Sequence, residues 1–126
     1  LSFSNFGSAP YPQTIKVADA VKIVHQKHPE LLIDGEMQAD TAVVAERLEQ
    51  EYPFAAIKGG ANVLIFPNLD SSNIAYKLLQ RLTDATVIGP ILVGMKKPVH
   101  VIQRGDTVND IINMTAIAVV GAKDHK

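Results

Sequence analysis

The stretch that decides the fold is residues 62–67, which read NVLIFP. A continuous apolar run that ends at a proline is typical of a strand covered on both faces. Asp70 or Ser71 can then cap a helix, and apolar residues recur after them at helical spacing. These apolar residues are Ile74, Ala75, Leu78, Leu79 and Leu82. The stretch therefore predicts a buried strand followed by a helix that packs on a sheet.

Short apolar runs and helical periodicity alternate on both sides of this stretch. The expected strands are residues 1–6, 31–33, 62–66, 86–93 and 98–102. The expected helices run through residues 17–24 up to Pro29, from 40 to 51, from 70 to about 83, and from 106 to about 121. Strands that alternate with helices predict an α/β fold, with a mostly parallel sheet and helices on both faces in three layers. We expect one domain over residues 1–126, with a disordered tail at 123–126.

The composition of the 126 residues narrows the class of protein. Net charge is −1 and cysteine is absent, so the chain has no field to attract nucleic acid and no thiolate chemistry, and it fits a cytoplasmic location. No apolar run is long enough to span a membrane, so neither nucleic acid nor a membrane is an expected partner. The chain opens inside an expected strand without an initiating Met. We therefore expect it to be cut from a longer protein, a trimmed N-terminus being the alternative.

The strand-to-helix loop at residues 103–110 carries the best candidate for anion binding. Arg104 and Gly105 lie between an expected strand and a helix that Asp106 can cap, so a guanidinium and backbone amides can meet a phosphate or carboxylate together. Asp110 can orient Arg104 or accept a proton from a ligand. The alternative, a loop arginine simply paired with a helix aspartate, is equally compatible with these residues.

Other charged residues give weaker indications. Lys77 and Arg81 share one edge of a helix and can hold phosphates of a long ligand, although solvated helix charges are the more common explanation. Asp34, Glu36 and Asp40 form an acidic cluster for which helix-cap and loop roles are favoured over Mg²⁺. The sequence contains neither a Walker A loop nor a dinucleotide-binding glycine pattern. We therefore expect no metal and no nucleotide cofactor in this segment.

Several segments, in order along the chain, resemble phosphate acetyltransferases and phosphate butyryltransferases. They are LSFS (1–4) with Gly7-Ser8, DGEMQAD (34–40), ANVLIFP (61–67), NIAYK (73–77), GPI (89–91), and Arg104-Gly105 with Asp110. The resemblance covers nearly the whole chain and implies the C-terminal portion of a phosphotransacetylase-like domain more than twice this length. It also implies a CoA-binding cleft between subdomains and a homo-oligomer.

The same resemblance assigns roles to individual residues. In the family a Ser-Arg-Gly segment lies at the cleft: the arginine engages phosphate or CoA, the serine contributes to the transition state, and a later aspartate is the proposed base for the CoA thiol. Here the segment reads Gln103-Arg104-Gly105, with Asp110 at the aspartate position. The longer glutamine side chain occupies the space of a small hydroxyl, which argues against acyl transfer.

Segments 4–8, 34–40 and 99–105 are most similar to the phosphotransacetylase-like extension of large NADP-dependent malic enzymes. This resemblance implies a non-catalytic regulatory module that senses acetyl-CoA, with Lys77, Gln103, Arg104 and Asp110 as ligand-binding residues. The parent protein would then decarboxylate malate to pyruvate, with its NADP and its Mg²⁺ or Mn²⁺ bound in the rest of the chain. Two alternatives stay open: an active phosphate acetyltransferase that uses Arg104 and Asp110 catalytically, and a subdomain kept for oligomer assembly.

Overall fold

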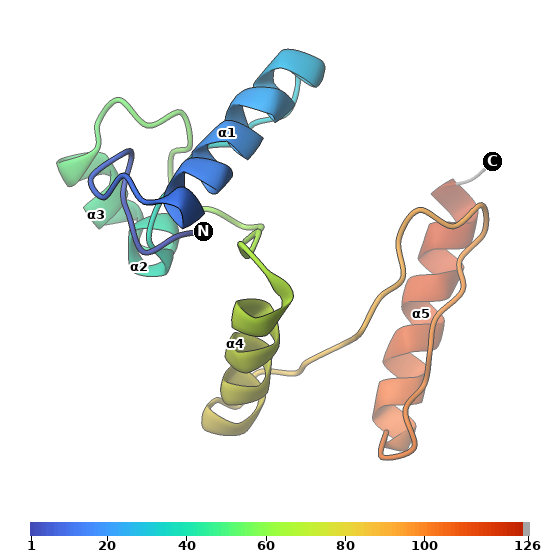
Figure 1. Cartoon of the computed structure of the whole chain (residues 1–126). Coiled ribbons are helices and arrows are strands. Elements are labelled where there is room, and N and C mark those ends of the chain that lie inside the picture. Colours follow the sequence, from blue (N-terminus) through green and yellow to red (C-terminus); the bar gives the residue numbers. More distant parts are fainter. Residues whose placement is uncertain (125–126) are drawn as a thin grey trace. The chain divides into compact units, whose positions relative to one another are not determined.

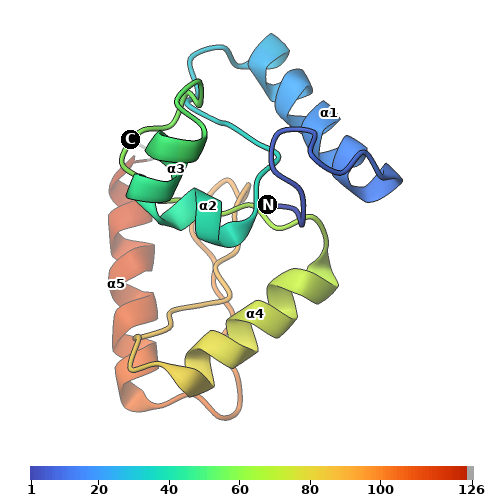
Figure 2. The ribbon, with the colours of Figure 1, turned by 90° about the vertical axis from the view of Figure 1, so that its left-hand side faces the viewer.

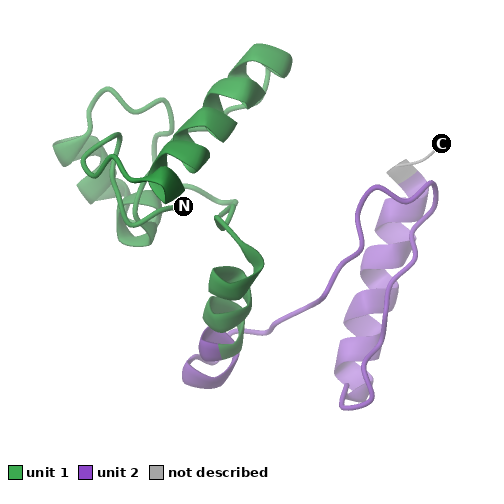
Figure 3. Cartoon of the chain, in the orientation of Figure 1, with its two compact units in different colours: residues 1–77 green, residues 78–126 purple. Residues whose placement is uncertain are grey.

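The computed structural model describes residues 1–124 and contains five α-helices in that range. They are α1 (Pro12–Lys27), α2 (Ala39–Val43), α3 (Ala45–Glu51), α4 (Leu69–Leu82) and α5 (Val108–Asp124), joined by irregular segments (Figures 1 and 2). The chain divides into two compact units, residues 1–77 and 78–126, and the division falls within α4 (Figure 3). No helix in the described range is long and apolar enough to cross a membrane.

The predicted parallel sheet is wrong, because residues 1–124 form helices and no strand. The predicted strand at 62–66 has only isolated backbone hydrogen bonds: Ala61 N, just before it, donates to Ala42 O at 2.7 Å, and the N-terminal amine donates to Ile65 O, within it, at 2.6 Å. Residues 1–6 likewise meet residues 36–37 at only two backbone hydrogen bonds. A strand requires a continuous backbone ladder with a neighbouring segment, and apolar alternation alone does not supply that neighbour.

The predicted helices are confirmed in outline. α1 starts at Pro12, which suits the first helical position, and ends before Pro29. The predicted helix 40–51 is broken at Val44, whose φ of −94° and ψ of 98° separate α2 from α3. α5 continues through Lys123 and Asp124, and the other two residues of the predicted tail lie outside the described range.

The first unit, residues 1–77, has a small buried core. Its buried apolar residues are Met37, Ala42, Leu48 and Ala55. Phe6 packs beside this core with its ring 5.2 Å from the ring of Tyr52 and 5.0 Å from that of Phe54, measured between centroids. These contacts hold the N-terminal segment against α3 and the turn that follows it.

The second unit is built around α5. Met114 is its one buried apolar side chain among residues 78–124. Gly121 allows close packing within this unit, because a Cβ atom there would lie 3.2 Å from Cγ of Pro98. Many large apolar side chains of the unit, including Val93, Val108 and Val120, are exposed.

Candidate functional site

Residues 103–106 form a turn closed from both sides by the same pair of residues. Gln103 N donates to Oδ2 of Asp106 at 2.7 Å, and Asp106 N donates to Gln103 O at 3.1 Å. Arg104 and Gly105 occupy the two central positions of this turn and are exposed. The turn therefore presents one guanidinium and a short stretch of glycine backbone to solvent, directly before α5.

Thr107, not Asp106, caps α5, which corrects the expectation from the sequence. Thr107 N and Thr107 Oγ1 donate to Oδ2 of Asp110 at 2.8 and 2.7 Å, and Asp110 N donates to Thr107 Oγ1 at 3.2 Å. This reciprocal arrangement is a capping box. The spacing Thr-x-x-Asp before an apolar helix is the signal in the sequence that would have revealed it.

The same hydrogen bonds alter the acidity of Asp110. The hydrogen bond from the Thr107 hydroxyl, followed by that from the Thr107 amide, lowers the pKa of the Asp110 carboxyl below its usual range. Donors that favour the ionised form make a carboxylate harder to protonate and therefore a weaker base. Asp110 is consequently better suited to hold the first turn of α5 than to accept a thiol proton.

The Arg104 guanidinium makes no hydrogen bond or ion pair within residues 1–124. The alternative of an Arg104–Asp110 pair is therefore wrong for this structure, since Asp110 bonds to Thr107 instead. Asp106 is likewise occupied by the amide of Gln103. The arginine is left as a cation beside the N-terminus of α5, where backbone amides and the helix dipole also favour an anion.

Lys77 lies on α4 at the end of the first unit, with Nζ 4.6 Å from the centroid of the Tyr76 ring. This is a cation–π contact between neighbouring residues on an exposed helix. The candidate loop belongs to the second unit, so a shared role for Lys77 and Arg104 stays a prediction.

Glu36 has a structural role that sequence reasoning missed. Its side chain is only 3% exposed, and Oε1 accepts hydrogen bonds from Ser4 Oγ at 2.7 Å and Gly7 N at 2.8 Å. Ser4 Oγ in turn accepts from Ala9 N at 3.0 Å. A buried carboxylate is tolerated when it accepts charge-assisted hydrogen bonds. Here the donors, Ser4 Oγ and Gly7 N, hold the N-terminal segment against Glu36. No spacing in the sequence indicates this contact.

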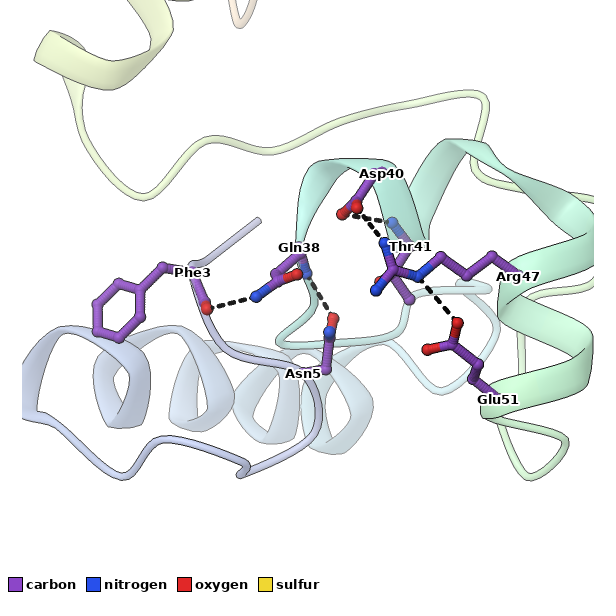
Figure 4. A network of polar contacts seen from close by, with 7 residues as sticks. All are labelled: Phe3, Asn5, Gln38, Asp40, Thr41, Arg47 and Glu51. Atoms are coloured by element: carbon purple, nitrogen blue, oxygen red, sulfur yellow. Dashed lines mark hydrogen bonds and ion pairs between the residues drawn. The ribbon is translucent and has the colours of Figure 1, made fainter.

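The remaining carboxylates of the predicted acidic cluster face separate partners. Asp34 accepts the amide of Gly35 at 2.8 Å and that of Ala56 at 2.6 Å. Asp40 accepts the amide of Thr41 at 2.9 Å and pairs with Arg47 (Figure 4). Across residues 1–124, no three histidine or acidic side chains come together in a way that could hold a metal ion.

Figure 4 shows how the residues after Glu36 tie the first unit together. Gln38 N donates to Asn5 Oδ1 at 2.7 Å, and Gln38 Nε2 donates to Phe3 O at 2.8 Å. Arg47 Nε lies 3.2 Å from Glu51 Oε1 on α3. The segment 34–40 is thus engaged in internal contacts, whereas the loop 103–110 leaves its cation open.

Three comparisons with known proteins agree on the family. The family profile described as "Phosphate acetyl/butaryl transferase" matches residues 1–119. The phosphate acetyltransferase of Bacillus subtilis is 48% identical over 122 residues, which cover 97% of this chain and 38% of that protein. The NADP-dependent malic enzyme of Escherichia coli is 42% identical over 124 residues, which cover 98% of this chain and 16% of that protein.

A solved structure gives the same result at the level of the fold. The EutD phosphotransacetylase from Staphylococcus aureus matches with a TM-score of 0.88 and 41% sequence identity, over 96% of this chain and 38% of that one. The chain spans less than two fifths of the length of each of these relatives. With the profile match over residues 1–119, these likenesses show that the chain belongs to the phosphate acetyl/butaryl transferase family.

Proposed function

We propose that this chain is a regulatory phosphotransacetylase-like domain that binds acetyl-CoA through the loop 103–110 and does not transfer the acyl group. The observation that carries the proposal is Arg104, an exposed cation that has no partner within residues 1–124 and is held in a closed turn before α5. Gln103 stands where the resembled acyltransferases have serine. The anion site is therefore retained while the small hydroxyl is lost.

The loop offers three kinds of contact to a phosphate group. The Arg104 guanidinium can form charge-assisted, bidentate hydrogen bonds. Gly105 lets a phosphate approach the backbone closely. The amides of Val108 and Asn109, in the first turn of α5, have no acceptor within the helix and point toward its N-terminus. Together they favour a compound with several phosphate oxygens, such as CoA, over a neutral ligand.

The parent that fits this role is an NADP-dependent malic enzyme, in which acetyl-CoA bound here would modulate the conversion of malate to pyruvate. The malic enzymes of E. coli and Haemophilus influenzae match 98% and 99% of the chain. NADP and Mg²⁺ or Mn²⁺ would be bound by the rest of that protein, because this chain has no dinucleotide-binding glycine pattern and the carboxylates of Asp34, Glu36 and Asp40 make internal contacts. The rest of the parent chain and further copies of the protein would be its partners in the cytoplasm.

An active phosphate acetyltransferase is the second candidate. It is favoured by sequence identity, since phosphate acetyltransferases reach 48% where the malic enzymes reach 42% and 43%. In that case Arg104 would hold the phosphate and Asp110 would accept the proton of the CoA thiol. The hydrogen bonds that lower the pKa of Asp110, and the glutamine at position 103, favour binding without transfer.

Calorimetric titration with acetyl-CoA tests the binding proposal. Arg104→Ala removes a charge-assisted contact worth about 1.5–3 kcal/mol, so the dissociation constant should rise about tenfold or more. Lys123→Ala is the matched control: it removes one positive charge from the far end of the same helix, and it should bind as wild type does. Equal dissociation constants for Arg104→Ala and wild type would place the ligand elsewhere.

A further inference from the structure

Asp106 bonds to the backbone of a single residue, Gln103, through both its side chain and its own backbone. The carboxylate accepts the Gln103 amide at 2.7 Å, and the Asp106 amide donates to the Gln103 carbonyl at 3.1 Å. Two hydrogen bonds between the same two residues fix the turn from both ends. The residues enclosed between them are Arg104 and Gly105.

The bonds of Asp106 are separate from those that cap α5. The capping box uses Thr107 and Asp110 only, so the helix can begin without Asp106. Asp106 also forms no ion pair with Arg104, although the two are separated by one residue. The Asp106 carboxylate is thus committed to the backbone of the turn, and the arginine keeps its charge available.

We propose that Asp106 is a positioning residue, which orders the turn so that Arg104 and Gly105 meet the phosphate groups of the ligand without rearrangement. This inference rests on the proposed function, because it presumes that Arg104 binds the phosphates of acetyl-CoA. Ordering a loop before binding lowers the entropy lost on association. It explains why an acidic residue stands next to an anion site, where its charge alone would weaken binding.

Two substitutions separate positioning from charge. Asp106→Ala removes a negative charge, which by electrostatics alone would tighten the binding of an anion, but it also opens the turn. If Asp106 positions Arg104, the dissociation constant for acetyl-CoA should rise about three- to tenfold in Asp106→Ala. Asp106→Asn keeps an acceptor oxygen for the Gln103 amide and loses the charge, and it should bind at least as tightly as wild type.

The experiment combines titration calorimetry with amide hydrogen exchange on the chain and its Ala and Asn variants. We expect the Gln103 amide to lose exchange protection in Asp106→Ala and to regain it in Asp106→Asn. The affinity for acetyl-CoA should likewise fall in Asp106→Ala and recover in Asp106→Asn. Tighter or unchanged binding of acetyl-CoA by Asp106→Ala, or unchanged protection at Gln103, would overturn the inference. Titration of Arg104→Ala keeps the two proposals apart: if it binds as wild type does, the proposed site fails, whereas the exchange data still decide whether Asp106 orders the turn.

Discussion

The two units differ in how they use the segments that resemble the family: segment 34–40 in the first unit makes internal contacts, whereas segment 103–110 in the second unit is exposed. In the first unit, residues 34–40 supply buried or bonded side chains, with Glu36 held by Ser4 and Gly7. In the second unit, residues 103–110 lie on the surface, and Arg104 has no partner in the described range. The segments that resemble one family are therefore internally bonded in the first unit and exposed in the second.

The first unit also buries more of its side chains than the second. Within residues 1–123, all five buried polar residues and four of the five buried apolar ones belong to the first unit. They are Ser4, Asn5, Thr14, Glu36, Thr41, Met37, Ala42, Leu48 and Ala55. The second unit contributes Met114 alone, as far as residue 123. Substitutions in the first unit should accordingly affect stability, and substitutions in the loop of the second unit should affect binding.

The largest expected effect is on the free energy of unfolding. Leu48 is fully buried at 0% exposure, whereas Leu79 is 56% exposed. Leu48→Ala should lower the free energy of unfolding by about 2–5 kcal/mol, because burial is lost and a cavity is left. Leu79→Ala, the matched control, should lower it by less than about 1 kcal/mol. Urea unfolding measures both, and equal losses would remove the contrast between the units.

Glu36 gives the next largest effect. Glu36→Ala leaves Ser4 Oγ and the Gly7 amide without their acceptor and should lower the free energy of unfolding by roughly 1–3 kcal/mol. Glu46→Ala, on the exposed side of α3, should change it little. We expect the affinity of the folded variant for acetyl-CoA to match that of wild type. A stable Glu36→Ala protein with lost affinity would mean that segment 34–40 belongs to the binding site.

The smallest of the stability effects concerns the cap of α5. Thr107→Ala breaks the capping box and should lower the free energy of unfolding by about 1 kcal/mol at pH 7. Thr115→Ala, whose hydroxyl donates to Ile111 O inside the same helix, should be near neutral and serves as the control.

The loss of stability caused by Thr107→Ala should depend on pH, and its sign follows from the lowered pKa of Asp110. A carboxyl whose pKa is lowered in the folded state stabilises it above the ordinary aspartate pKa of about 4, and the contribution disappears as the pH falls through the lowered value. Thr107 lowers the pKa of Asp110. The stability difference between wild type and Thr107→Ala should therefore narrow from pH 7 to pH 3 in urea unfolding. A difference that widens on acidification would show that Asp110 is not held by Thr107.

The sequence predicted the helices well because a helix is stabilised by contacts between residues three and four apart. α1 and α4 follow from that spacing, and α1 also from Pro12 at its start and Pro29 after its end. The sheet could not be predicted in the same way, because a strand depends on a neighbour far along the chain. The run 62–66 is apolar enough for a strand, but its backbone does not pair in a ladder.

The loop 103–110 precedes a helix, as the sequence predicted, although the segment before the loop is not a strand; its role as a binding site stays a prediction. The contacts within the loop were harder to predict. Asp106 and Thr107 both have side chains that can cap a helix, and the sequence favoured the wrong one. The Thr107-x-x-Asp110 spacing allows reciprocal hydrogen bonds and distinguishes the two candidates, but the prediction of Asp106 as the cap did not take it into account. The burial of Glu36 depends on Ser4, 32 residues away, and no local pattern indicates such a contact.

We propose that the loop 103–110 binds acetyl-CoA without transferring its acyl group. The most direct measurement is the rate of acetyl phosphate formation from acetyl-CoA and phosphate by the intact protein, with Gln103→Ser beside wild type. We expect no formation above the uncatalysed rate in wild type at acetyl-CoA concentrations that saturate binding, and any gain of activity only in Gln103→Ser. Turnover by wild type in the range of ordinary enzymes, about 1–10³ per second, would contradict the claim and identify the protein as a working acyltransferase.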